Sequence, residues 1–222
     1  MSTLQNALSA LKGGKFVLLH DGDGRENEAD LLLLAEKATP AHVRTLRKDA
    51  GGLICLATDK GTAKRLGLEF ATDMLAKSCS PTIARMGRAR MKYGDMPAFT
   101  ISINHLGTFT GIPDNDRALT MREFGKLVKS RGTAREFAKS FRAIGHVFLL
   151  AARGLEARRG HTELSVELAR MAGCTQAVVL CEMLSDTGRA ASKQEAISYA
   201  RRHKIPFIEG KQVLEAHYGK GK

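Results

Sequence analysis

Apolar residues along the chain follow two kinds of spacing, and each predicts a type of secondary structure. Near the start, Leu4, Ala7, Leu8 and Leu11 repeat with the period of a helix, and Gly13-Gly14 is typical of its end. Elsewhere the apolar residues form short runs bounded by glycine, proline or charged residues, which is typical of strands. We expect strands at residues 16–19, 31–35, 53–57, 98–104, 147–152, 177–183 and 206–208.

Polar residues mark where helices begin. Thr39-Pro40 places a capping side chain before a proline at the first helical position. A threonine or serine followed three residues later by glutamate, the capping-box pattern, occurs at Thr120, Thr133 and Ser192. We therefore expect helices to begin at these positions. Further helices are expected at 4–11, 162–172 and 212–218, with a short one ending near Gly67.

The alternation of strands and helices predicts an α/β fold. We expect a three-layer single domain over 1–222, in which helices flank a mixed, twisted β-sheet. In the strand at 98–104, Phe99, Ile101 and Ile103 alternate with polar residues, so these side chains should point inward. Residues 77–97 carry glycine, proline and many basic residues without periodicity, and we expect an exposed excursion there.

Composition is typical of a globular protein of a reducing compartment. The chain has 222 residues, 43% of them hydrophobic, and its longest apolar run is far shorter than a membrane span. The first residues lack the basic and apolar segments of a secretory signal. Cys55, Cys79, Cys174 and Cys181 form no CxxC pair, so we expect free thiols and a cytoplasmic location.

The net charge of +12 allows two interpretations. Basic residues gather at 85–92, 126–142, 153–159 and 220–222, and such an excess could bind nucleic acid. However, aromatic residues make up only 5%, tryptophan is absent, and no RNP, zinc-finger or KH pattern occurs. We therefore expect a basic surface that attracts small phosphorylated anions. An RNA-binding or nucleotide-binding protein on a related fold is the alternative.

The stretch His20–Asp30 holds five carboxylates and one arginine between two apolar runs. If it is extended, Glu26, Glu28 and Asp30 lie on one face and repel one another unless a cation intervenes. Oxygen-only clusters suit a hard divalent ion such as Mg²⁺, and Arg25 suits a phosphate or carboxylate ligand. An EF-hand does not fit, because Arg25 and Glu26 stand where its loop needs an acid or Asn and then Gly. A solvated acidic loop is the alternative.

Two further clusters carry reactive side chains. Arg158-Arg159-Gly160-His161-Thr162 precedes a predicted helix, whose free backbone N–H groups favour an anion, and its histidine is a candidate metal ligand or proton carrier. His146 and Glu182 each border an apolar strand, where burial moves the pKa of either group toward neutral pH. The alternative is structural: His146 bonds a backbone carbonyl and Glu182 pairs with Arg189.

Six motifs follow one another along the chain: Arg25-Glu26-Asn27-Glu28-Ala29-Asp30, Thr110-Gly111-Ile112, Asp116-Arg117, Gly145-His146-Val147, Arg158-Arg159-Gly160-His161-Thr162-Glu163 and Cys181-Glu182. Taken in order, they resemble the 3,4-dihydroxy-2-butanone-4-phosphate synthase family of riboflavin biosynthesis. The stretches 47–55 and 109–117 resemble the archaeal branch in particular. The resemblance covers nearly the whole chain and is weakest over 78–96.

The resemblance implies an enzyme that uses Mg²⁺, with Mn²⁺ as a second candidate metal, and no organic cofactor. It implies conversion of D-ribulose 5-phosphate to L-3,4-dihydroxy-2-butanone 4-phosphate and formate, in a homodimer with sites near the subunit interface. Glu26 and His161 match the metal ligands, and His146 and Glu182 match the acid–base pair. The residues that match substrate-binding positions are Arg25, Glu26, Glu28, Asp30, Thr110, Arg158, Arg159, Gly160, His161, Thr162 and Glu182.

Three residues depart from the family pattern. Gly22 and Gly24 stand where relatives often carry acidic residues, and Pro113 stands where a small hydroxyl residue is common. None of them replaces a residue that matches a ligand position. We therefore expect these changes to alter the order of the loops more than the chemistry.

Overall fold

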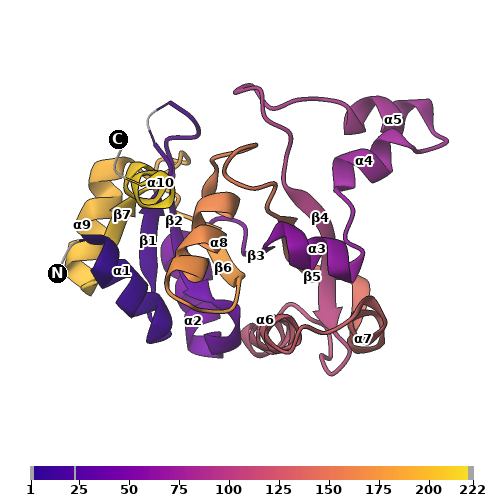
Figure 1. Cartoon of the computed structure of the whole chain (residues 1–222), viewed down its shortest axis with the longest axis horizontal. Coiled ribbons are helices and arrows are strands. Elements are labelled where there is room, and N and C mark those ends of the chain that lie inside the picture. Colours follow the sequence, from indigo (N-terminus) through magenta and orange to yellow (C-terminus); the bar gives the residue numbers. More distant parts are fainter. Residues whose placement is uncertain (1–2, 23, 220–222) are drawn as a thin grey trace.

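The computed structural model describes residues 3–22 and 24–219, in which strands and helices alternate (Figure 1). Asp23 and the basic residues of 220–222 lie outside the described residues. The strands are β1 (Val17–His20), β2 (Ala29–Leu34), β3 (Cys55–Thr58), β4 (Phe99–His105), β5 (Phe141–Ala151), β6 (Ala177–Glu182) and β7 (Phe207–Glu209). The helices are α1 (Thr3–Lys12), α2 (Pro40–Thr45), α3 (Lys60–Leu66), α4 (Ala71–Ala76), α5 (Pro81–Gly87), α6 (Asp114–Lys129), α7 (Ala134–Ser140), α8 (His161–Met171), α9 (Lys193–His203) and α10 (Gly210–Tyr218), with a 3₁₀ turn η1 (Ala35–Lys37) and a π-helical turn η2 (Leu46–Ala50).

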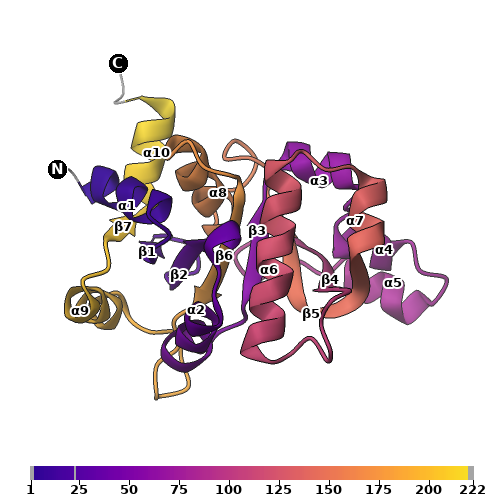
Figure 2. The ribbon, with the colours of Figure 1, turned by 90° about the horizontal axis from the view of Figure 1, so that it is seen from below.

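The strands form one mixed sheet in the order β4-β5-β3-β6-β2-β1-β7. β3 runs parallel to β5 and β1 runs parallel to β7, whereas the other neighbours are antiparallel. Helices α2, α6, α7 and α9 bury apolar side chains against one face of the sheet, and α1, α8 and α10 do so against the other (Figure 2). The predicted three-layer α/β fold is therefore confirmed.

Two of the three capping boxes expected at helix starts are confirmed. Thr133 and Ser192 each cap a helix and accept a hydrogen bond from the backbone of the third helical residue. Thr120 does not begin a helix. It is buried in the middle of α6, where its hydroxyl accepts a hydrogen bond from the backbone N–H of His105 at 3.0 Å. The helix starts at Asp114 instead, with acidic residues in its first turn that complement the helix dipole.

Burial along β4 differs from the expected alternation. Thr100 and Ser102 are buried, Phe99 and Ile101 are only half-buried, and Ile103 alone of the three apolar residues is fully buried. The register between β4 and β5 shifts between Phe99 and Ser102 and again after Ile103. The first shift is by one residue and moves the side chains that follow it to the other face, so a simple alternation cannot describe this strand.

The segment 77–97 is more regular than expected, because it contains α5. Most of its side chains are exposed. Helices α4 and α5 form an arm that projects from the β4 side of the sheet, and residues 88–98 lead back from it to β4 without helix or strand (Figure 1).

The four cysteines are free, and Cys55 and Cys181 are buried. Burial raises the pKa of both thiols, which makes them poor nucleophiles. Among the described residues, no helix is both long and apolar enough to cross a membrane.

The sheet order brings residues from distant parts of the chain to one end of the sheet. Asp30 at the start of β2 pairs with Glu182 at the end of β6. Helix α8 begins at His161, whose ring nitrogen Nε2 lies 3.1 Å from the carbonyl oxygen of Glu28. The β1–β2 loop, the end of β6 and the start of α8 therefore meet here.

Helix α6 packs closely against η1 at Gly125, and a substitution at this glycine tests that contact. A Cβ atom on Gly125 would lie 2.6 Å from the backbone nitrogen of Glu36. Alanine favours a helix interior by about 1 kcal/mol over glycine, but overpacking against a backbone costs about 1–3 kcal/mol. We therefore expect Gly125→Ala to lower the midpoint of urea unfolding. Gly24→Ala is the control, because its Cβ would meet nothing within 4 Å. An unchanged midpoint for Gly125→Ala would contradict this packing.

Candidate active site

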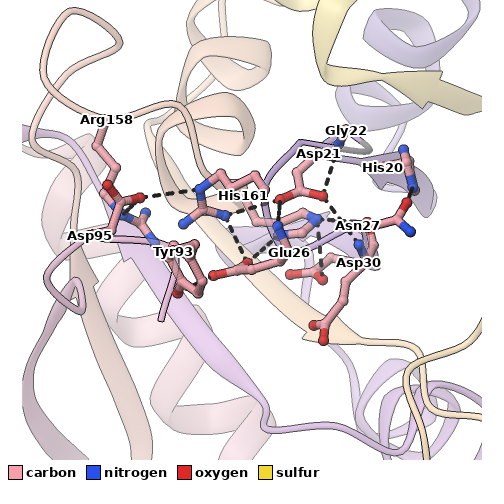
Figure 3. Close-up of polar contacts among 12 residues, drawn as sticks. His20, Asp21, Gly22, Glu26, Asn27, Asp30, Tyr93, Asp95, Arg158 and His161 are labelled. Carbon is pink, nitrogen blue, oxygen red and sulfur yellow. Dashed lines mark hydrogen bonds and ion pairs between the residues drawn. The ribbon is translucent and has the colours of Figure 1, made fainter. Parts of the chain in front are cut away.

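The side chain of Asp21 holds the acidic loop between β1 and β2 in place (Figure 3). Its Oδ1 accepts hydrogen bonds from the backbone N–H groups of Gly22 (2.8 Å) and Glu28 (3.2 Å). Its Oδ2 accepts from the backbone N–H of Glu26 and from the guanidinium of Arg25, each at 3.1 Å. Four hydrogen bonds to this one carboxylate therefore determine the shape of the loop. The sequence did not single out Asp21 for this role, because the role depends on how the loop turns.

The loop is not extended as expected. Asn27 has a φ of 56°, in the left-handed region, and β2 begins only at Ala29. Strand alternation therefore does not direct the side chains of Glu26 and Glu28. The turn does so instead, and both carboxylates still line the same cavity as Asp30.

This cavity has a volume of about 320 Å³ and lies beside the start of α8. Glu182 and Cys55 contribute to its wall from β6 and β3. The other residues around it are Glu26, Glu28, Asp30, Met91, Tyr93, Pro97, Ala98, Phe99, Leu150, Arg158, His161, Thr162 and Leu180. A larger hollow of about 670 Å³ lies near α9 and α10, but no ionisable side chain that lines it is buried. Buried ionisable side chains, among them those of Asp30 and His161, line the smaller cavity instead.

His161 lies at the centre of the acidic residues and is 4% exposed. Its Nδ1 lies 3.3 Å from Oε2 of Glu26, and its Nε2 lies 3.1 Å from the carbonyl oxygen of Glu28 and 3.6 Å from Oδ1 of Asp30. Both partners in the hydrogen bonds are acceptors, so both ring nitrogens must donate, which makes the ring an imidazolium. Burial alone would lower the pKa of His161, but the charge of Asp30 and the hydrogen bond to Glu26 raise the pKa to about 9.

The carboxylates around His161 differ in their proton affinity. Burial would raise the pKa of Glu26, but hydrogen bonds from His161 and Tyr93 and the charge of Arg25 lower it well below its ordinary value. Burial raises the pKa of Asp30 to about 7, although the charge of His161 opposes the shift. Burial and the charge of Glu26 also raise the pKa of Glu28. A negative charge on Asp30 or Glu28 is therefore costly, and the positive charge of His161 between the carboxylates reduces that cost.

The residues fit a divalent metal ion. Ligand atoms of Asp21, Glu26 and His161 all lie within 4.8 Å of one another. The oxygen Oδ1 of Asp30 is buried 3.6 Å from Nε2 of His161 and has no hydrogen-bond partner among the residues that the structure describes. Carboxylate oxygens with one imidazole nitrogen suit Mg²⁺ or Mn²⁺. Glu26 and His161 are thus brought together as predicted, and Asp21 joins them.

Two arginines cover the start of α8. A Cβ atom on Gly160, the N-cap of the helix, would lie 2.6 Å from Nη1 of Arg158 and 2.6 Å from Nη2 of Arg25, so only glycine leaves room for both. The guanidinium of Arg158 donates to Glu163 at 2.6 Å, and Asp95 lies near both arginines (Figure 3). Arginine side chains over a helix start form a setting for an anion. Tyr93 and Asp95 come from the segment without periodicity, which is why the sequence did not indicate them.

His146 and Thr110 lie outside the residues that line the cavity. The side chain of Asn104 holds them together: its Oδ1 accepts from the backbone N–H of His146 at 2.8 Å, and its Nδ2 donates to the carbonyl of Thr110 at 3.4 Å. His146 is exposed, so the expectation that it lies near the core is wrong. The exposed Arg159 points elsewhere too, with its guanidinium 5.7 Å from the ring centre of Tyr218.

Glu182 lies in the cavity wall and is half-buried. Its Oε2 accepts a hydrogen bond from the backbone N–H of Leu53 at 2.8 Å, and no ion pair joins it to Arg189 within the described residues. A Cβ atom on Gly52 would lie 2.5 Å from the same oxygen, so the glycine lets the carboxylate lie close to the backbone. The structural alternative of a pair with Arg189 is therefore wrong.

Known proteins resemble this chain over nearly its whole length. The family model of 3,4-dihydroxy-2-butanone 4-phosphate synthase matches residues 5–216. The synthase of Methanosarcina mazei is 44% identical over 96% of this chain and 90% of its own length. That of Methanothermobacter thermautotrophicus is 42% identical over 96% and 95%.

Solved structures give the same result. The structure of a 3,4-dihydroxy-2-butanone 4-phosphate synthase in complex with two magnesium ions has a TM-score of 0.75 and 30% identity, over 99% of this chain and 98% of that one. The Candida albicans synthase has a TM-score of 0.74 and 30% identity, over 97% of each chain. The chain therefore belongs to the 3,4-dihydroxy-2-butanone 4-phosphate synthase family, whose members are enzymes of the lyase class.

Proposed function

We propose that the chain converts D-ribulose 5-phosphate to L-3,4-dihydroxy-2-butanone 4-phosphate and formate, a step of riboflavin biosynthesis. The observation that carries this proposal is the ring of carboxylates around His161, next to two arginines at a helix start. The first group suits a divalent metal ion, and the second suits a phosphate. The free cysteines fit a reducing cytoplasm as the location.

The phosphate of the substrate would bind at the start of α8. Arg158 and the backbone N–H groups after Gly160 offer donors, and the hydroxyl of Thr162 lies in the same wall. Arg25 would add a second guanidinium beside that of Arg158, and Asp30 would hold the sugar from the wall of the cavity. Because the phosphate does not react, its binding energy serves to fix the sugar in position.

Mg²⁺ would be held by Glu26 and His161, with Asp21 adjacent, and Mn²⁺ could replace it. When bound, the ion would stabilise negative charge that develops on the oxygens of the sugar. No organic cofactor is required by this proposal.

We assign the acid–base steps of the reaction to Glu182 and His146. Loss of formate begins with the removal of a proton from a carbon beside the ketone, and later steps return protons. Glu182 lies in the wall of the cavity, across the strand pair from Asp30, and is suited to exchange protons with the sugar. Glu28 lies beside them with a raised pKa, which favours a helping role in proton transfer.

We also propose that the chain forms a homodimer in which His146 and Thr110 reach the cavity of the partner. Both are exposed, and the surface around them is apolar: Phe109 is 92% exposed and Ile144 is 89% exposed. Large apolar side chains exposed to this degree are typical of interfaces. A shared site would explain how a histidine that lies on the surface of one chain can take part in the chemistry of this cavity.

A direct assay tests the proposed reaction. The purified protein, given D-ribulose 5-phosphate and Mg²⁺, should release formate and a four-carbon phosphate in equal amounts, as followed by NMR. Folded, metal-loaded protein that releases no formate would contradict the proposal. Binding of RNA at physiological salt by the same preparation would then favour the nucleic-acid alternative.

The metal assignment predicts the behaviour of two variants. Glu26→Gln and His161→Ala should each abolish formate release and weaken Mg²⁺ binding in calorimetry, because each removes a ligand atom. Glu69→Gln and His203→Ala alter exposed residues outside the cavity and serve as controls. If either site variant bound Mg²⁺ as the wild type does, its residue would not be a ligand.

The shared site predicts complementation between inactive variants. His146→Ala and Glu182→Gln should each lose about 10²–10⁴-fold in turnover, the scale of a lost acid–base group, while still binding Mg²⁺. When the two are mixed and allowed to exchange subunits, half the dimers should contain one intact site, which restores roughly a quarter of wild-type activity. A mixture that stays inactive although subunits exchange would mean that both residues act within one chain.

A further inference from the structure

The carboxylate of Asp95 lies close to both arginines that cover the start of α8, and Figure 3 shows it beside Arg158. Its Oδ2 lies 3.3 Å from Nε of Arg25 and 3.6 Å from Nε of Arg158. The side chain of Asp95 is 33% exposed, whereas those of Arg25 and Arg158 are 14% and 8% exposed. The carboxylate of Asp95, which belongs to the irregular segment 88–98, therefore contacts two arginines that are nearly buried.

The arginines are incompletely bonded even with Asp95 present. Nη2 of Arg25 and Nε of Arg158 are buried and have no hydrogen-bond partner in the described part of the chain. By contrast, Glu163 is fully buried and accepts from Nη1 of Arg158 at 2.6 Å. Glu163 is thus a fixed partner of Arg158. Asp95 makes longer and more exposed contacts, which can be exchanged at low cost.

A tight turn carries Asp95 to this place. The backbone N–H of Met91 donates to the carbonyl of Asp95 at 3.0 Å, and Gly94 takes a φ of 89° that suits glycine. The same turn brings the hydroxyl of Tyr93 to Oε1 of Glu26, to which it donates at 2.5 Å. Burial and this hydrogen bond raise the pKa of Tyr93 to about 12, so the hydroxyl keeps its proton.

We propose that Asp95 is an internal competitor: its carboxylate holds the two arginines until a dianionic phosphate ester replaces it. A monoanion that displaced Asp95 would exchange one carboxylate for another and gain little. A phosphate brings nearly two negative charges and three acceptor oxygens, enough to bond both guanidiniums and their unpartnered N–H groups. Every anion that enters must displace Asp95, so the residue weakens the binding of each anion by a similar factor. Carboxylates, the formate product included, then bind too weakly to occupy the site, whereas phosphate still binds. The inference rests on the proposed function, since it assumes the phosphate site at Arg158.

Calorimetric titration with inorganic phosphate and with acetate tests this role. Asp95→Asn keeps the size of the side chain and removes its charge. Its Kd for phosphate should be roughly three- to tenfold lower than that of the wild type, as expected when partly exposed ion pairs no longer compete. Its Kd for acetate should fall by a similar factor, because both anions no longer have to displace a carboxylate. Asp95→Glu, which keeps the charge, should retain the wild-type Kd values. Asp73→Asn, on the exposed face of α4, is the matched control.

The outcomes separate this role from a structural one. If Asp95 only anchors the turn, Asp95→Asn should bind phosphate more weakly and melt at a lower temperature, and that result would overturn the proposal. Unchanged Kd values for both anions in Asp95→Asn would overturn it too. Arg158→Ala separates the two proposals. Phosphate binding by the wild type that is lost in Arg158→Ala upholds the phosphate site even if Asp95 fails. Equal binding by both would refute the site and the role of Asp95 together.

Discussion

Mutual repulsion among the carboxylates around His161 is the constraint on which the rest of the site depends. Glu26, Glu28, Asp30 and Glu182 line one small cavity, and burial raises the pKa of Asp30 and of Glu28, so a negative charge on either is costly. The imidazolium at the centre offsets part of this cost in the ligand-free protein. A divalent ion would offset more of it, because it brings a second positive charge to the same place. Binding of a cation would therefore lower the electrostatic free energy of the acidic cluster.

The fold builds this cluster from three rigid parts and one loop. The antiparallel pair of β2 and β6 fixes Asp30 opposite Glu182, and helix α8 presents His161 from its first turn. Both strands are buried by helices on their two faces, so these side chains have little freedom to separate. The β1–β2 loop is the adaptable part, and the hydrogen bonds to Asp21 determine its shape.

Much of this arrangement could be predicted from the sequence. Apolar runs and helical spacing indicated the strands and most helix starts, because buried faces leave a periodic signal. The motifs around Glu26, His161 and Glu182 indicated the chemistry. The contacts of Tyr93 and Asp95 could not be predicted, since they depend on a turn that returns an irregular segment to the cavity. The register shifts between β4 and β5 could not be predicted from the sequence either, because a bulge leaves the composition of a strand unchanged.

The most direct test of this account is to locate a metal ion in crystals of the protein. Crystals grown with Mn²⁺ should give an anomalous scattering peak between Glu26 and His161, within bonding distance of both. The ring of His161 should then have lost its bond to the carboxylate of Glu26, because the ion takes the place of the shared proton. Metal bound only at surface carboxylates, with His161 still donating to Glu26 inside an empty cavity, would contradict the central claim.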